Sequence, residues 1–122
     1  MARISHFRQL RAWQGGMDLV EALYQSSPAF PRAGLYGLTS QICRAAVSIP
    51  SNIAEGHSRA STREYLQHVS IAQASLAEVE TQMGIAKRSG YVAMQEVVPI
   101  LDRAAVLGRQ SYALRDALAK KP

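Results

Sequence analysis

The sequence has little cysteine, few aromatic residues and no long apolar run, and two of these shortages limit the class of protein. Its one cysteine, Cys43, cannot form an internal disulfide, whereas small secreted domains commonly need several. The longest unbroken apolar runs have four residues, so no segment is expected to span a membrane. The first residues also lack the apolar stretch of a signal peptide. We therefore expect a cytoplasmic protein.

The length and composition predict one globular domain. The chain has 122 residues, of which 48% are apolar and 19% are charged. Domains commonly contain about 100–200 residues, so residues 1–122 leave no room for separate catalytic and binding halves. The composition is that of a chain with a packed core and excludes a disordered one.

Lysine is also scarce, because the positive charge comes mainly from arginine. The chain has 11 Arg and three Lys against nine acidic residues, which gives a formal net charge of +5. Arginine binds phosphate groups through two parallel hydrogen bonds, so this excess favours a nucleic-acid partner. Genome composition and solubility are the alternative explanation. Basic residues gather at both termini, and we interpret residues 1–9 as a basic N-terminal arm and 119–122 as a basic C-terminal tail.

Apolar residues recur at steps of three and four in four segments, and no segment alternates as a strand does. The sequence therefore predicts an all-α fold, an antiparallel up-down four-helix bundle. The expected core stripes are Leu10, Trp13, Met17, Val20 and Tyr24, widened by Leu23; Leu38, Ile42, Ala45, Ile49 and Ile53; Tyr65, Val69, Ala72, Leu76, Val79, Met83 and Ala86; and Val97, Leu101, Ala104, Leu107, Ser111, Leu114 and Leu118.

Helix-breaking and capping residues add local expectations. Gly15 and Gly16 weaken a helix unless packing holds it or another backbone approaches closely. Pro50 lies inside the second apolar pattern and should kink that helix. Ser61 and Glu64 form a capping box, in which each side chain bonds the backbone amide of the other. Gly90 is expected to end the third helix in the left-handed conformation.

Polar residues at helical spacing form a second stripe on the second and third helices. These stripes are either two solvated faces, or a partly buried polar seam within or between subunits, or a ligand site. Short amide and hydroxyl side chains favour the seam, and we predict that Arg44 pairs with Glu78 or Glu55. The stripe on the second helix is Gln41, Arg44, Ser48, Asn52 and Glu55, and that on the third is Glu64, His68, Ser75, Glu78 and Gln82.

The second helix carries a motif that resembles the signature of the 23S ribosomal RNA intervening-sequence proteins. Shorter pieces at residues 7–14, 30–39 and 71–78 are also similar to this family, with Ala74 where the family more often has glycine. The resemblance covers residues 6–92. The motif reads Arg44-x-x-x-Ser48-Ile49-x-x-Asn52-Ile53-Ala54-Glu55-Gly56, followed by a Ser/Thr-rich turn.

The resemblance implies a four-helix bundle that assembles into a symmetric ring of identical subunits, a pentamer where members are known. It also implies similarity to the accessory protein of diversity-generating retroelements, which associates with a reverse transcriptase and with nucleic acid. The encoding of some relatives inside ribosomal RNA gene insertions suggests a link to RNA.

Motifs that would indicate an enzyme are missing from the sequence. The chain has no Glu-x-x-His pair for a di-iron centre, no zinc-binding HExxH and no phosphate-binding glycine loop. The three histidines are scattered and no His–Asp pairing is readable beside Cys43. We therefore expect no enzymatic activity, no metal site and no cofactor.

The sequence favours a non-catalytic homo-oligomer that binds nucleic acid, RNA rather than DNA, through basic arms and surface. Binding would depend on phosphate contacts with little reading of base sequence. The alternatives are a protein-interaction scaffold that docks a partner enzyme, and a small-ligand-binding bundle. The candidate nucleic-acid contacts are Arg3, Arg8, Arg11, Arg59, Arg63, Lys87 and Arg88, and the candidate polar seam is Arg44, Ser48, Asn52, Glu55 and Glu78.

Overall fold

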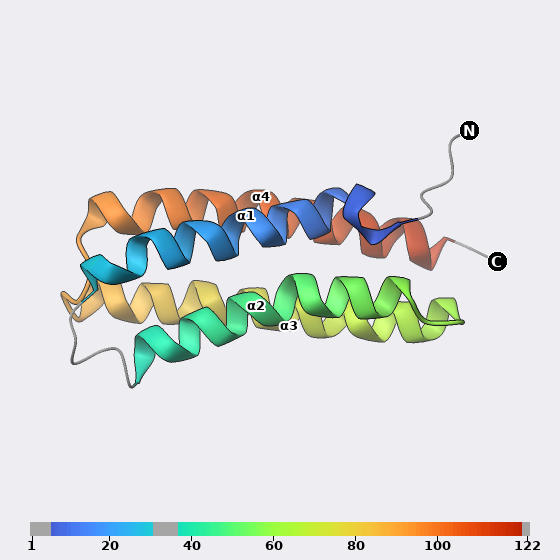
Figure 1. The fold of residues 1–122 in the computed structure, drawn as a ribbon, viewed down its shortest axis with the longest axis horizontal. Coiled ribbons are helices and arrows are strands. Elements are labelled where there is room, and N and C mark those ends of the chain that lie inside the picture. The colour runs from blue at the N-terminus through green and yellow to red at the C-terminus, as the bar shows by residue number, and fades with distance from the viewer. Residues whose placement is uncertain (1–5, 31–36, 121–122) are drawn as a thin grey trace.

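The computed structural model describes residues 6–30 and 37–120, and within these ranges it contains helices and no strand (Figure 1). The all-α prediction is therefore confirmed for the described chain. Two short 3-10 helices accompany four long α-helices. The elements are η1 (Phe7–Gln9), α1 (Arg11–Ser26), η2 (Ser27–Ala29), α2 (Leu38–His57), α3 (Thr62–Arg88) and α4 (Met94–Ala119).

The four α-helices lie side by side as a bundle (Figure 1). Helix α1 packs against α2 and α4, and α3 packs against the same two helices, so the four helices close around one core. The start of α1, the end of α4 and the connection between α2 and α3 lie at one end of the bundle, and the connection between α3 and α4 lies at the other. No helix in the described part of the chain is both long and apolar enough to cross a membrane.

The predicted core stripes of the second, third and fourth helices are confirmed. Ile42, Ile49 and Ile53 of α2 are at most 1% exposed, and every stripe residue of α3 except the half-buried Tyr65 is buried. Helix α4 adds Ile100, which the sequence pattern did not include. The residues whose side chains are most completely buried are Leu19, Leu23, Ile42, Ile49, Ile53, Met83, Ile100, Leu107, Val69, Val79 and Val97.

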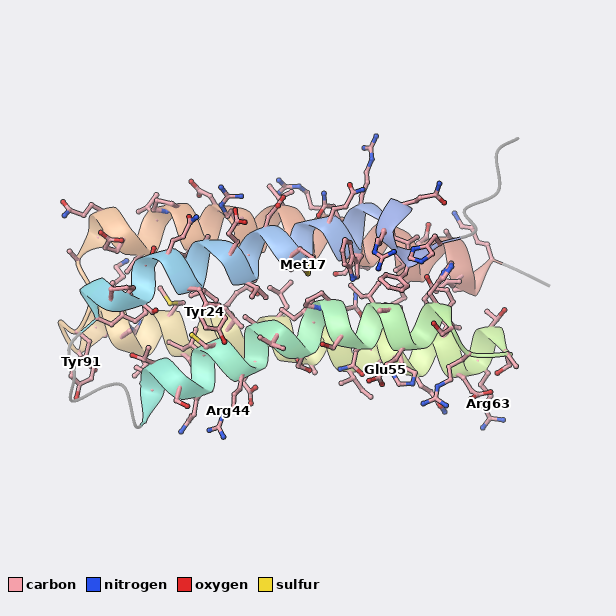
Figure 2. The ribbon with its side chains drawn as sticks, in the orientation of Figure 1. Met17, Tyr24, Arg44, Glu55, Arg63 and Tyr91 are labelled. Atoms are coloured by element: carbon pink, nitrogen blue, oxygen red, sulfur yellow. The ribbon has the colours of Figure 1, made fainter. Side chains whose placement is uncertain are left out.

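The predicted core stripe of the first helix is wrong at two positions. Met17 and Tyr24 were expected in the core, but they are 45% and 55% exposed. Both lie on the outer face where α1 meets α2 (Figure 2). The buried face of α1 is turned by about one residue from the expected stripe, and it presents smaller side chains. Its buried residues are Ala12, Gly16, Leu19 and Leu23.

The close approach expected at the glycine pair explains this rotation. A Cβ atom on Gly16 would lie 3.2 Å from both Cβ and Cδ of Pro50, so α1 contacts α2 directly at this point. A Cβ atom on Gly15 would overlap the side chain of Gln110 on α4. The two glycines therefore let α1 settle against both neighbours. Helix α2 continues through Pro50 and changes direction near its middle (Figure 1).

Both predicted ends of α3 are present. As expected, the Ser61 hydroxyl accepts a hydrogen bond from the Glu64 backbone amide at 3.2 Å. The second bond of the capping box differs: the Glu64 carboxylate accepts from the Ser61 hydroxyl at 3.1 Å and not from the Ser61 backbone amide. Gly90 has φ of 72°, the left-handed conformation. The Tyr91 amide donates to the Ala86 carbonyl at 2.9 Å and closes the helix end.

The described part of the predicted N-terminal arm is folded onto the bundle. Residues 7–9 form η1, which contacts α1 and α2. The rings of Phe7 and Trp13 lie 5.5 Å apart, and the Arg8 guanidinium lies 5.4 Å from the centre of the Phe7 ring. This aromatic contact holds the segment in place. The remaining residues assigned to the arm and tail, 1–5 and 121–122, lie outside the described residues.

Candidate functional site

Helices α2 and α3 are joined by a row of side-chain hydrogen bonds as well as by the core. The Ser48 and Ser75 hydroxyls lie 2.9 Å apart, and Gln82 Nε2 donates to Gln41 Oε1 at 3.3 Å. Most of these side chains are half-buried, so the two polar stripes form a seam within one chain. We use the name polar seam for Gln41, Ser48, Asn52, His68, Ser75 and Gln82.

Asn52 is the centre of the polar seam because both ends of its amide are engaged. Its Nδ2 donates to the Ser48 carbonyl at 2.8 Å and to the Ser48 hydroxyl at 3.0 Å, and its Oδ1 lies 3.0 Å from His68 Nδ1. Since Oδ1 only accepts, His68 Nδ1 must carry the proton. His68 Nε2 is then free to accept from Arg59 Nε at 3.3 Å. The seam therefore holds His68 in one tautomer and connects it to a basic residue.

The predicted pairing of Arg44 with Glu78 or Glu55 is wrong within this chain. Arg44 has no ion pair among the described residues, and its side chain points away from the bundle (Figure 2). Arg44 and Glu78 lie on the rim of a groove of about 350 Å³, and both are exposed. Glu55 lies 3.8 Å from His68 Nδ1 instead. An ion pair between exposed side chains adds little stability because water solvates both charges, so an ion pair of Arg44 with Glu78 would be only weakly favoured.

Gly56, the last residue of the sequence motif, allows α2 and α3 to meet closely. A Cβ atom there would lie 2.8 Å from His68 Cβ and 3.0 Å from Tyr65 Cδ1. The Tyr65 hydroxyl lies 3.3 Å from His57 Nδ1, and burial raises the pKa of Tyr65 to about 12. The phenol is therefore protonated at neutral pH. A side chain at Gly56 would push apart the helices that position these groups.

Cys43 lies half-buried on α2, and burial raises the pKa of its thiol. The thiol is therefore protonated at neutral pH, which is the weakly nucleophilic form.

The structure divides the candidate nucleic-acid contacts between the two ends of the bundle. One group lies at the end of the bundle where α1 starts and α4 ends, where Figure 2 places Arg63, and we call this group the basic end. Lys87 and Arg88 end α3 at the opposite end of the bundle, and Arg3 lies outside the described residues. All the described candidates are exposed. The basic end consists of Arg8, Arg11, Arg59 and Arg63.

Two further basic residues lie near the same end of the bundle: Arg115, four residues before the end of α4, and Lys120, directly after that end. Lys120 Nζ forms an ion pair with Asp116 Oδ2 at 3.0 Å, whereas Arg115 has no ion pair among the described residues. Arg115 was not among the contacts expected from the sequence. The sequence did contain a signal for Arg115. The chain turns from α3 to α4 at Gly90, and Arg63 lies 27 residues before this glycine and Arg115 lies 25 residues after it. Because the two distances are nearly equal, the two arginines are expected at the same end of the bundle.

Together, the four helices and the polar seam on α2 and α3 define a small helical-bundle protein with an exposed basic end. A family profile described as 23S rRNA-intervening sequence protein matches residues 8–113. The chain belongs to this family, as the motif on α2 indicated. No curated protein matches the chain.

The contact between Asn52 and His68 predicts coupled losses of stability. Replacing either residue by alanine leaves the other polar group without its partner, so each change should lower the free energy of unfolding by about 1 kcal/mol. The double variant should lose less than the sum of the two, with a coupling of about 0.5 kcal/mol or more. Denaturant unfolding of the four proteins measures this coupling. Ser51→Ala, exposed on the same helix, is the control and should change stability by less than about 0.5 kcal/mol. Strictly additive losses would show that the two side chains do not interact.

Proposed function

We propose that the chain is an up-down antiparallel bundle that assembles into a ring of identical subunits and binds nucleic acid without catalysing a reaction. The resemblance implies a pentamer and favours RNA over DNA, and we place the protein in the cytoplasm. The observation that carries the proposal is the gathering of Arg8, Arg11, Arg59 and Arg63 at one end of the bundle.

The carboxylates near the basic end form no ion pair with its four arginines in the described part of the chain, and Glu55 lies beside His68 instead. Glu64 accepts a hydrogen bond from Ser61, and Asp116 pairs with Lys120. Arg11 and Arg63 therefore have no carboxylate partner in the described part of the chain. An arginine fork binds a phosphate through two hydrogen bonds and releases counterions condensed on the nucleic acid. This mechanism predicts affinity that depends on salt and little on base sequence.

An exposed apolar groove between α1 and α2 supports self-association. The groove has a volume of about 370 Å³, and Trp13, Met17, Val47 and Pro50 contribute to its lining. Met17 and Val47 are 45% and 40% exposed, although both are large apolar side chains. Contiguous exposed apolar surface commonly marks an interface, and a second copy of the chain would cover it. A ring would repeat the basic end in every subunit and so turn weak contacts into avidity.

Light scattering and an RNA titration test this proposal. The mass should be five times the 13.3 kDa of one chain, and the affinity for RNA should fall at least about tenfold between low and physiological salt. A chain that stays at 13.3 kDa at high concentration would contradict the ring. Binding that is absent, or that does not weaken with salt, would contradict the nucleic-acid function and favour the scaffold that docks a partner enzyme.

A small ligand in the groove beside the polar seam is the second candidate function. Gln41, Ser48, Ser75 and Gln82 line this groove together with Arg44 and Glu78. Gln82 Oε1 is buried and accepts no hydrogen bond within the described chain, so a ligand donor there would satisfy it. A ligand that protects this groove should raise the melting temperature of the protein, and Gln82→Leu should abolish that shift.

A further inference from the structure

A further groove lies between α3 and α4, near the end of the bundle where α3 starts and α4 ends. Its volume is about 600 Å³, larger than the groove beside the polar seam and the apolar groove between α1 and α2. We propose that this groove holds a single strand of nucleic acid, an inference that rests on the proposed function and names its substrate class. The residues that carry the argument are Arg63, Leu66, Gln67, Ser70, Arg115 and Leu118.

The charge of this groove distinguishes it from its neighbours. Arg63 of α3 and Arg115 of α4 both line it, and no carboxylate is among its lining residues. The groove at the polar seam has Arg44 with Glu78, and the groove near η1 has Arg59 with Glu55. The small groove between α1 and α4 also carries both signs of charge.

Both arginines of the α3–α4 groove are available for a ligand. Arg63 and Arg115 are exposed, and neither has an ion pair within the described residues. The nearest acidic residue in sequence to Arg115 is Asp116, which pairs with Lys120 at 3.0 Å. Two unpaired guanidinium groups on facing helices complement a ligand with repeated negative charges, such as a phosphodiester backbone.

The rest of the lining offers the other contacts that a nucleotide needs. Gln67 and Ser70 are exposed, so their amide and hydroxyl groups can bond phosphate or ribose oxygens. Leu66 is half-buried and Leu118 is 4% exposed, and together they give the groove an apolar component. Proteins that bind single strands combine a positive groove for the backbone with aromatic side chains that stack on the bases. No aromatic residue is among the described lining residues of this groove, so its affinity should depend mainly on the phosphate contacts.

The shape of the groove favours a single strand over a duplex. The axes of two packed helices lie about 8–10 Å apart, so the space between them is narrow. A duplex is a wide, convex rod whose phosphates lie on its outer surface. It would rest on the rim of the groove. A single strand can enter, and its backbone then meets Arg63 from one helix and Arg115 from the other.

Fluorescence anisotropy with a short labelled uridine oligonucleotide and a labelled hairpin duplex tests this proposal in the full chain. The wild-type protein should bind the oligonucleotide more tightly than the hairpin. The double variant Arg63→Gln and Arg115→Gln should lose about tenfold in affinity for the oligonucleotide, and the slope of log affinity against log salt should fall by about 1.4, about 0.7 for each lost phosphate contact. Arg63 and Arg115 are exposed, so circular dichroism melting should confirm that the double variant folds.

The matched control removes the same charge from outside the groove. Arg103→Gln with Arg109→Gln changes two exposed arginines of α4 that do not line the groove, and the affinity for the oligonucleotide should fall much less.

The possible outcomes separate this inference from the proposed function. Equal losses of affinity in the two double variants would overturn the assignment of the groove as the binding site while leaving the proposed function intact. Failure of the wild-type protein to bind either probe would overturn the proposed function itself. Hairpin binding as tight as that of the oligonucleotide would overturn the single-strand assignment. If polyglutamate displaces the oligonucleotide as readily as unlabelled RNA does, the ligand of the groove would be an acidic peptide and not nucleic acid.

Discussion

The Ile53→Ala variant is expected to lower the free energy of unfolding by about 3 kcal/mol, within the range of about 2–5 kcal/mol for large core truncations. Ile53 is 0% exposed and lies on α2, the helix that packs against both α1 and α3. Removing its side chain loses the transfer free energy of the buried methyl groups and leaves a cavity that packed helices fill only in part. Urea unfolding followed by far-UV circular dichroism measures the loss.

Ile71→Ala is the matched control for this prediction. Ile71 is 49% exposed on α3, so the same substitution should change stability by less than about 1 kcal/mol. Equal losses at the two positions would contradict the assigned core, because they would mean that Ile53 is no more buried than Ile71.

The Gly56→Ala variant is expected to lose about 1–3 kcal/mol although alanine is the better helix former. The new Cβ would lie 2.8 Å from His68 Cβ and 3.3 Å from the Tyr65 carbonyl oxygen, so it would press on backbone as well as side chain. Helices α2 and α3 would have to separate near the end of the polar seam. Thermal and urea unfolding measure the effect.

Gly84→Ala is the matched control, and it should change stability in the opposite direction. Gly84 lies inside α3, and a Cβ atom there would have nothing within 4 Å. Alanine should therefore stabilise the helix by about 0.5–1 kcal/mol. A stabilised Gly56→Ala variant would show that α2 and α3 do not meet as closely as the structure has them.

Most of the fold could be predicted from the sequence because apolar period and capping residues are local signals. The stripes of α2, α3 and α4, except Ile100, follow from spacing, and the turn at Gly90 follows from the glycine itself. The face of α1 could not be predicted in the same way, because large residues at Met17 and Tyr24 outweighed small ones in the pattern. The rotation of α1 about its own axis is decided by the close contact of Gly16 with Pro50. The two residues lie on different helices, so the apolar pattern of α1 by itself does not contain this contact.

The candidate site was predictable in composition but not in its pairings. Helical spacing placed Ser48 and Asn52 on one face of α2, yet the contact of Asn52 with His68 depends on how α2 and α3 align along their lengths. The same alignment decides that Arg44 has no ion partner within the described chain. Sequence spacing does not contain this information, since it describes one helix at a time.

The most direct test of nucleic-acid binding at the basic end compares the two ends of the bundle. Arg11→Gln with Arg63→Gln removes two charges from the basic end, and Lys87→Gln with Arg88→Gln removes two from the opposite end. The RNA affinity of the first variant should fall about tenfold, and its salt dependence should weaken, while the second should stay close to wild type. Equal losses in the two variants, or a larger loss in the second, would contradict the assignment of nucleic-acid binding to the basic end.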